Sequence, residues 1–457
     1  MRTASRLRLL ITPWLAAAVC AAPALANPYE TRLDNGLRVI VKEDRRAPTA
    51  VHMVWYRIGS MDEVDGTSGV AHVLEHMMFK GTPTVGPGEF NKRVAAAGGR
   101  DNAFTSRDYT AYFQQIPREK LGEMMALEAD RMRHLNVDAS EFAQEIKVVM
   151  EERRMRTDDD PQAKLFEQMN AVAFQAHPYR RPIIGWMSDL ENMSAADAKA
   201  WYDNWYVPNN AYVVVTGDVD HKAVFALAQQ HYGALPARAL PLRKEQVEPR
   251  QEGPRRVTVK APAELPVLIM GYKMPILRDA RQDREPYALE ILASILDGHD
   301  AARFNRKLVR EDKVALSAGV SYDSTARGPG MLYLYGSPAE GRSVAELESA
   351  LREEIKRIQE QGVSAAELRR SKAQLIAGQV YKLDSMFGQA MEIGQMEAVG
   401  LPWQDVEVMR ERLQNVSAAE VQAVAKKYFN DDALTVGILD PQPLDGKPRR
   451  PAVAVRH

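Results

Sequence analysis

The sequence has almost no cysteine, few aromatic residues and no excess of charge of either sign. Its one cysteine among 457 residues is Cys20, and aromatic residues make up 7%. A chain that lacks cysteine forms no disulfides and offers no thiolate as metal ligand or nucleophile. Sixty basic and 61 acidic residues give a net charge of −1, without the basic excess that nucleic-acid-binding domains show. Any metal site outside the Cys20 region must therefore use His, Asp and Glu.

Long apolar runs are also lacking, except for a short one near the first residue. The first residues combine a basic start, an apolar run and a small-x-small pattern: Arg2, Arg6 and Arg8, residues 9–22, and Ala24-Leu25-Ala26. These features predict a cleavable signal peptide over residues 1–26 and a periplasmic or secreted protein. A retained membrane anchor is the alternative, although the run is short for a spanning helix. Lipidation at Cys20 is weakly indicated, because Ala17 stands where a lipoprotein signal usually has Leu.

Cleavage after Ala26 removes three arginines and no acid, so the mature net charge becomes −4. It also removes the only cysteine. No later segment has the roughly 18 uninterrupted apolar residues that span a membrane, so we expect no stable membrane insertion.

Strand-like and helix-like segments interleave on both sides of a charged, proline-rich stretch at residues 236–256. We interpret this stretch as a linker between a domain at 27–235 and a similar domain at 257–440. The order of elements repeats, which predicts an α+β fold of two similar halves. Residues 441–457, rich in proline and basic residues, are expected to be a disordered tail.

The segment HVLEH at residues 72–76 contains two candidate metal ligands and the candidate catalytic base. His72 and His76 are four residues apart, which on a helix puts both imidazoles on one face within reach of a single Zn²⁺. Glu75 lies at the edge of that face, where it can act as general base towards the water that a zinc ion activates. The spacing H-x-x-E-H is the inverted zinc-peptidase motif.

A catalytic zinc takes three protein ligands and keeps one open position. The predicted helix at 140–156 places Glu145 and Glu152 two turns apart on one face, whereas Glu151 points elsewhere. We therefore predict Glu152 as third ligand and Glu145 as a carboxylate that orients the site. Taken alone, a two-histidine helix and an acidic helix are more often solvated surfaces. The small and apolar residues around His72 and His76 favour a buried site, where metal binding compensates the buried polar groups.

Three runs then make a resemblance specific: HVLEHMMFKGT (72–82), GGRDNAFTSRDYTAYF (98–113) and EIKVVMEERR (145–154). Together they resemble the pitrilysin/insulinase family of inverted-motif zinc peptidases, in particular the half-length group that includes the mitochondrial processing peptidase beta subunit. In that family the third ligand follows the second histidine by 76 or 77 residues. Glu152 follows His76 by 76 residues, which supports its assignment.

The resemblance implies further roles. Asn102 and Ala103 match a segment that forms an edge strand, to which an extended peptide adds by backbone hydrogen bonds. Phe79 matches a position that lines the pocket just after the scissile bond, and plain core packing is its alternative. The family fold implies two halves that close like a clamshell around unfolded peptides.

One departure from the family concerns an Arg and a Tyr seven residues apart that contact the substrate. Arg310 matches the Arg, but Ser317 stands where the Tyr is expected, and a Ser hydroxyl is too short to replace a phenol. The resemblance therefore implies the zinc-carrying subunit of a two-subunit enzyme, with a homologous non-zinc partner that supplies the Arg/Tyr pair. A homodimer is the alternative.

The sequence thus predicts a zinc endopeptidase for short or unfolded peptides, with one Zn²⁺ per chain. Two alternatives stay open: a non-catalytic structural or assembly subunit of the same family, and a peptidase dedicated to one biosynthetic peptide. Inactive relatives typically lose His or Glu from the motif, whereas this chain retains the four residues of the site.

Overall fold

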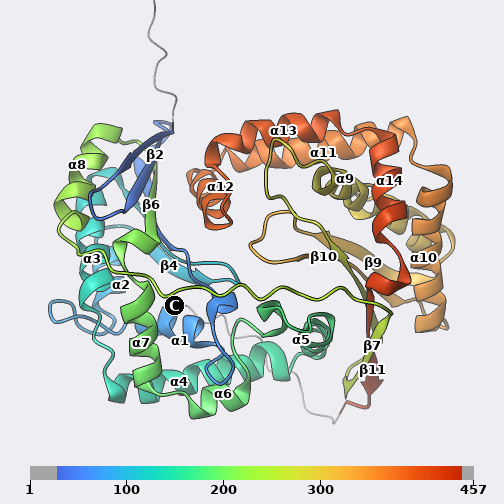
Figure 1. Ribbon diagram of the computed structural model, residues 1–457, viewed down its shortest axis with the longest axis horizontal. Helices are drawn as coiled ribbons and strands as arrows, with labels where there is room; N and C mark the ends of the chain where they lie inside the picture. The colour runs from blue at the N-terminus through green and yellow to red at the C-terminus, as the bar shows by residue number, and fades with distance from the viewer. Residues whose placement is uncertain (1–27, 445–457) are drawn as a thin grey trace, which may run out of the picture.

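Two mixed β-sheets form the framework of the computed structural model, which describes residues 28–444 (Figure 1). The first sheet has the order β1-β2-β6-β3-β5-β4 and the second β7-β11-β8-β10-β9. The strands of the first sheet are β1 (Tyr29–Arg32), β2 (Arg38–Glu43), β3 (Thr49–Tyr56), β4 (Arg100–Thr105), β5 (Thr110–Pro117) and β6 (Ala211–Gly217). Those of the second are β7 (Arg255–Pro262), β8 (Val267–Met274), β9 (Ala315–Tyr322), β10 (Gly330–Pro338) and β11 (Leu434–Gln442).

Apart from β1, each strand of the first sheet has a counterpart at the same place in the second. The pairs β2–β6 and β7–β11 are parallel, and the other pairs in both sheets are antiparallel. The predicted α+β fold of two similar halves is therefore confirmed.

Helices cover the sheets of both halves. The first half contributes α1 (Val70–Met77), α2 (Glu89–Ala96), α3 (Leu121–His134), α4 (Ala139–Arg153), α5 (Pro161–Ala173), α6 (Met187–Asn192), α7 (Ala195–Trp205) and α8 (His221–Tyr232). The second contributes α9 (Glu285–Asp297), α10 (Val344–Gln361), α11 (Ala365–Lys382), α12 (Met386–Ala398), α13 (Val406–Asn415) and α14 (Ala418–Tyr428). Capping boxes fix several starts: Ser343, Ser364 and Ser417 each exchange hydrogen bonds with a Glu three residues later.

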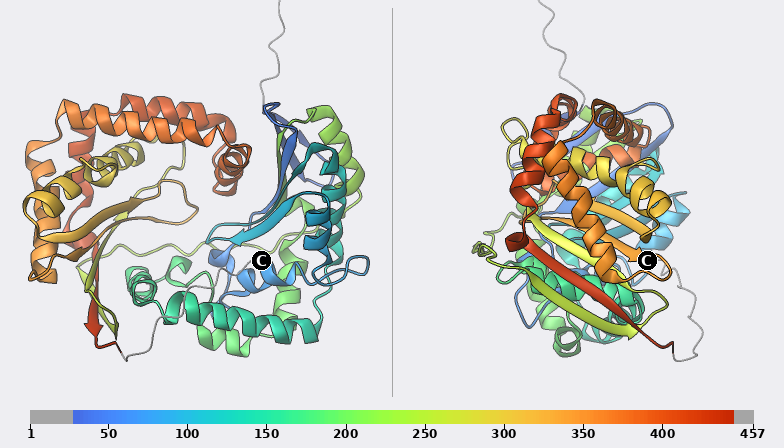
Figure 2. Two further views of the ribbon diagram at one scale, coloured as in Figure 1. Left: turned by 180° about the vertical axis from the view of Figure 1, so that it is seen from behind. Right: turned by 90° about the vertical axis from the view of Figure 1, so that its right-hand side faces the viewer.

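Each half contributes one helix to the sheet of the other half, as Figures 1 and 2 show. Helix α12 packs on the first sheet, where Ala390 and Ile393 join Trp55 in one buried cluster. Helix α5 packs on the second sheet, where Leu165 and Met169 lie among buried strand residues. The two halves are therefore joined by apolar cores as well as by the chain itself.

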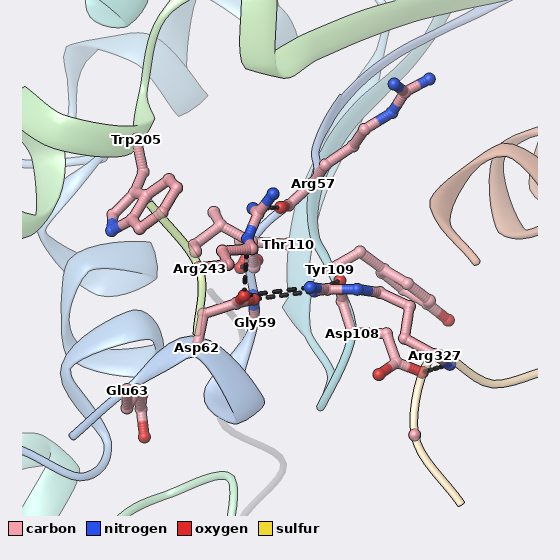
Figure 3. Close-up of polar contacts among 12 residues, drawn as sticks. Arg57, Gly59, Asp62, Glu63, Asp108, Tyr109, Thr110, Trp205, Arg243 and Arg327 are labelled. Carbon is pink, nitrogen blue, oxygen red and sulfur yellow. Dashed lines mark hydrogen bonds and ion pairs between the residues drawn. The ribbon is translucent and has the colours of Figure 1, made fainter. Parts of the chain in front are cut away.

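The linker between the halves is held by ion pairs at two points. Arg243 of the linker and Arg327 of the β9–β10 loop both bind the buried carboxylate of Asp62, as Figure 3 shows. Farther along, Glu248 accepts hydrogen bonds from three consecutive backbone N–H groups, those of residues 175–177, and pairs with Lys273 on β8 at 2.5 Å. The linker therefore connects both halves through side chains and not only through its backbone.

Two strands of the second sheet extend beyond the range 257–440 that the sequence predicts for the second domain. Strand β7 begins at Arg255, inside the predicted linker, and β11 ends at Gln442, inside the predicted tail, because the two strands pair along their whole length. Residues 1–27, with the predicted signal peptide, and residues 445–457 lie outside the described residues. Between residues 28 and 444, no helix is both long enough and apolar enough to cross a membrane.

Candidate metal centre

Helix α1, which carries the HVLEH segment, begins at a tightly constrained point. The Glu63 carboxylate accepts hydrogen bonds from the backbone N–H groups of Gly69 (2.8 Å) and Ala71 (2.9 Å), two donors that a helix start leaves unpaired. Gly69 has a φ of 89°, and a Cβ there would lie 2.5 Å from the carbonyl oxygen of Ile184. Glycine is required at this position by both its backbone conformation and the close approach, and the helix is thereby fixed in place.

Three ligand-type side chains from α1 and α4 converge below the surface. His72, His76 and Glu152 are all buried, and their nearest donor atoms lie within 4.8 Å of one another. Glu152 Oε2 lies 3.8 Å from His72 Nε2 and 3.4 Å from His76 Nε2. Two donors that each lie about 2.1 Å from a tetrahedral zinc are roughly 3.4 Å apart. The donor set and its spacing therefore fit a zinc ion.

Glu145 contacts His76 through the ring nitrogen that does not face Glu152. Its Oε1 lies 2.9 Å from His76 Nδ1, so a protonated Nδ1 donates to Glu145 and leaves Nε2 facing Glu152. Burial opposes the charged form of His76, but hydrogen bonds to Glu145 and Glu152 outweigh it and raise its pKa to about 9. A metal ion held by His72, His76 and Glu152 would take the place of that proton, and its binding would release protons.

Lys80 forms an ion pair with Glu145 on the side away from the ligands. Burial raises the pKa of Glu145, but its bonds to His76 and Lys80 have the larger combined effect and lower it to about 2. Glu145 therefore carries a negative charge beside the His76 ring.

Glu75 lies beside the ligands and has its own support. It is 5% exposed, and the Thr105 hydroxyl on β4 donates to its Oε2 at 2.5 Å. Burial, aided by the nearby charge of Glu152, raises the pKa of Glu75 above its usual range. A raised pKa makes a carboxylate a stronger base, which suits a group that accepts a proton and returns it.

A cavity of about 530 Å³ opens beside His72 and Glu75. One wall is β4, which is the outer strand of the first sheet and contributes Asn102 and Ala103 to the lining. The predicted edge strand therefore lies next to the site, with one side of its backbone not paired to another strand. Helix α5 and the segment 180–184 provide the opposite walls.

Two predicted substrate-binding residues lie apart from this cavity. Phe79 packs in the first-half core against Phe90, Tyr112 and the Arg131 guanidinium, which agrees with its alternative interpretation as a core residue. Arg310 is exposed and is not part of the cavity lining.

Ser317 lies in β9 at the edge of the second sheet and pairs with Ser337 of β10. Residues 304–311, which include Arg310, form a π-helical segment just before β9.

Several residues that line the site are not among those predicted from the sequence. Thr105 is two residues after Ala103, so on a strand both side chains lie on the same face. Once the strand is assigned, this spacing indicates that both residues face the site. Arg156 pairs with Glu152 at 2.5 Å from the π-helical turn after α4, and this irregular turn has no clear sequence signal. Asn170 of α5 accepts a hydrogen bond from Tyr333 of the second half at 2.7 Å, a contact between segments far apart in the chain.

Comparison with protein families matches both halves. Residues 38–186 match the model described as insulinase (peptidase family M16), and residues 192–375 match the model of the peptidase M16 inactive domain. The chain is 30% identical over 442 residues to the zinc protease PqqE of Helicobacter pylori, covering 95% of this chain and 97% of that protein. It is also 30% identical over 415 residues to an uncharacterized zinc protease of Mycobacterium tuberculosis, covering 90% and 92%.

Solved structures give the same result. A protease from Helicobacter pylori superposes with a TM-score of 0.85 at 29% identity, covering 91% of this chain and all of that one. The periplasmic protease PqqL from Escherichia coli shares the fold with a TM-score of 0.78 at 20% identity, and this chain spans 48% of its length. The chain belongs to peptidase family M16, the family of inverted-motif zinc peptidases that the sequence resembles.

Proposed function

We propose that this protein is a zinc-dependent endopeptidase that cleaves short or unfolded peptides. The observation that carries the proposal is the convergence at one cavity of a buried ligand set, a carboxylate of raised pKa and an edge strand. Its relatives named zinc proteases support the same conclusion. The alternative of a structural subunit is not favoured, because His72, His76, Glu75 and Glu152 are all present and lie together.

His72, His76 and Glu152 would hold one Zn²⁺ per chain. When bound, the ion lowers the pKa of a water molecule and polarises the scissile carbonyl. Glu145 keeps the His76 ring oriented, and burial of the three ligands excludes bulk water from their side of the site.

Glu75 accepts the proton of the attacking water and passes it to the leaving amine. The Thr105 hydroxyl holds one carboxylate oxygen, which leaves the other towards the reacting atoms. Residues Asn102 and Ala103 bind the peptide as an added strand on β4, which grips the backbone without reading its sequence.

A second subunit completes the site in this proposal. Arg310 is exposed and outside the cavity, and Ser317 takes the place of the family's tyrosine. A homologous subunit without zinc would supply the Arg/Tyr pair, with a homodimer as the alternative. Full peptidase activity from purified monomeric chain would contradict this part of the proposal.

We also propose export by the signal peptide at residues 1–26, to the periplasm or outside the cell. The relative in fold from Escherichia coli is described as periplasmic.

Cleavage of quenched fluorescent peptides by purified chain tests the proposal. Wild type should cleave with zinc bound, and Glu75→Gln should bind zinc equally but lose at least about 100-fold in kcat, the scale of general acid–base catalysis. Equal activity in the two proteins would refute the assigned base. Zinc binding with no cleavage, restored by added partner subunit, would support the two-subunit form.

A further inference from the structure

The cavity beside Glu75 is lined by four arginines, and three of them have carboxylate partners. Arg180 and Arg181 share Asp65, at 2.5 and 2.9 Å, and Arg156 pairs with Glu152. Arg107 differs, because no carboxylate of residues 28–444 forms an ion pair with it within 4.0 Å. The lining acid Glu167 does not compensate it, because both of its oxygens are bound to Arg153.

The side chains that contact the Arg107 guanidinium are aromatic. Its Cζ lies 5.0 Å from the centre of the Tyr179 ring, and the guanidinium also interacts with the Tyr333 hydroxyl. Its Nε is buried without a hydrogen-bond partner. The adjacent Asp108 is occupied elsewhere: its carboxylate accepts the Tyr179 hydroxyl at 2.5 Å and the backbone N–H of Arg327 at 3.1 Å. Arg107 is half-buried and lacks a carboxylate partner within 4.0 Å in the described part of the chain, so its guanidinium is placed to bind an anionic ligand in the cavity.

The backbone of Arg107 is also fixed. Its carbonyl oxygen accepts the N–H of Met61 at 2.9 Å, and the preceding carbonyl of Ser106 accepts the N–H of Ser60 at 3.1 Å. A Cβ at Gly59 would lie 2.5 Å from the Arg107 carbonyl oxygen, so the two segments are in close contact. The guanidinium therefore projects from a rigid turn just beyond β4, and little entropy is lost when it binds a ligand.

We infer that Arg107 is a specificity-determining residue that binds a carboxylate of the peptide substrate, and that the enzyme prefers acidic peptides. This inference rests on the endopeptidase function proposed above. Arg107 follows Thr105, which holds Glu75, by two residues. An extended peptide advances about 3.3 Å per residue, so the bound carboxylate lies within about three residues of the scissile bond. It is either an Asp or Glu side chain or the free C-terminus of the peptide.

Two peptide series distinguish these sources. The first has amidated ends and carries Glu, Gln or Lys at each of the three positions on either side of the scissile bond. The second has only neutral side chains, with a free or amidated C-terminus at increasing distance from that bond. Wild type should cleave the favoured acidic peptide about 10- to 100-fold better in kcat/KM than its neutral counterpart, the range for hydrogen bonds to a charged group.

Variants of Arg107 assign the preference to this residue. Arg107→Gln should bring the acidic-to-neutral ratio close to 1 by slowing only the acidic peptide, and Arg107→Lys should retain part of the ratio. Arg107→Glu should reverse it in favour of Lys. Arg154→Gln removes an exposed arginine that pairs with Glu151 outside the cavity, and it should leave the ratio unchanged.

Peptide affinity of the Glu75→Gln protein, measured by fluorescence anisotropy, gives a second readout that needs no turnover. The inference would be overturned if wild type cleaved acidic and neutral peptides equally well and the Glu75→Gln protein bound them equally tightly. It would also be overturned if the preference for acidic peptides survived in Arg107→Gln. Preferential binding of acidic peptides, with no cleavage by the wild type either alone or with an added partner subunit, would instead contradict the endopeptidase proposal and leave the role of Arg107 standing.

Discussion

The two halves of the molecule share one topology but differ at the first long helix after their second equivalent strand. In the first half this helix is α1, whose buried residues include His72, Glu75 and His76. In the second half it is α9, whose buried residues are mainly apolar, such as Leu289, Ile291 and Leu292. The same scaffold therefore supports either a polar cluster or a mainly apolar contact at this helix.

The difference shows what a buried polar cluster requires. In the first half, α4 faces α1 with Glu145 and Glu152, and Glu63 satisfies the start of α1. Because unpaired buried charges cost several kcal/mol, the buried polar side chains of α1 and α4 need each other and their outer partners. The second half needs none of these, and it matches the family model of an inactive domain.

The largest expected effect comes from removing one predicted metal ligand from the first half, since the second half has no such ligand on α9. Glu152→Gln removes the anionic ligand between two histidines and should weaken zinc binding by more than about 100-fold, with matching loss of peptidase activity. Even the loss of a residue that only contacts a ligand typically lowers metal affinity or activity 10- to 100-fold. Zinc competition with a chromogenic chelator measures the affinity. The neighbouring, exposed Glu151→Gln is the control and should bind zinc like wild type.

Glu145→Gln should have a smaller effect on the same site. It keeps all three ligands but weakens the hydrogen bond between residue 145 and His76 Nδ1, so zinc affinity should fall by about 10- to 100-fold. The same chelator titration applies. An affinity equal to that of wild type would mean that the His76 ring is fixed by packing alone.

Helices α5 and α12, which each pack on the sheet of the other half, can be compared by their contributions to the free energy of unfolding. A Cβ at Gly394 of α12 would lie 2.1 Å from the Trp55 ring, a fixed and buried neighbour. Gly394→Ala should therefore destabilise the protein by about 1–3 kcal/mol. Gly271→Ala, on the second sheet, meets the flexible ends of two methionines at 2.7 Å and the Tyr333 ring at 3.4 Å, and it should cost less.

Thermal unfolding measures both changes. Gly378→Ala in α11, where no atom lies within 4 Å of the added Cβ, is the control and should be neutral or slightly stabilising. A larger loss for Gly271→Ala than for Gly394→Ala would contradict this account of α12.

The smallest effect concerns the linker. Burial raises the pKa of Glu248, but three backbone N–H groups and Lys273 outweigh it and lower the pKa to about 2. Its ionised form therefore adds stability above pH about 4.5, and this contribution is lost as the pH falls towards 2. Wild type should be more stable than Glu248→Gln at pH 7, and the two should converge near pH 2 in denaturant unfolding. A constant difference over this range would refute the assignment; Glu245→Gln, in the same linker, is the control.

Much of this architecture could be predicted from the sequence, for local reasons. His72 and His76 are linked by helical spacing, and Glu145 and Glu152 share one helix face, so their positions follow from periodicity. The exchange of α5 and α12 between the halves could not be predicted, because it depends on contacts between segments far apart in the chain. Arg107 and Thr105 were missed for a similar reason, since their roles depend on which strand lies beside α1.

Zinc-edge X-ray absorption of the purified chain, with metal quantified per chain, tests the central claim most directly. The account predicts one zinc per chain with two imidazole nitrogens and one carboxylate among its ligands, and loss of this signal in Glu152→Gln. Zinc that persists unchanged in Glu152→Gln, for example at the partly exposed group Glu43, Asp220 and His221, would contradict it.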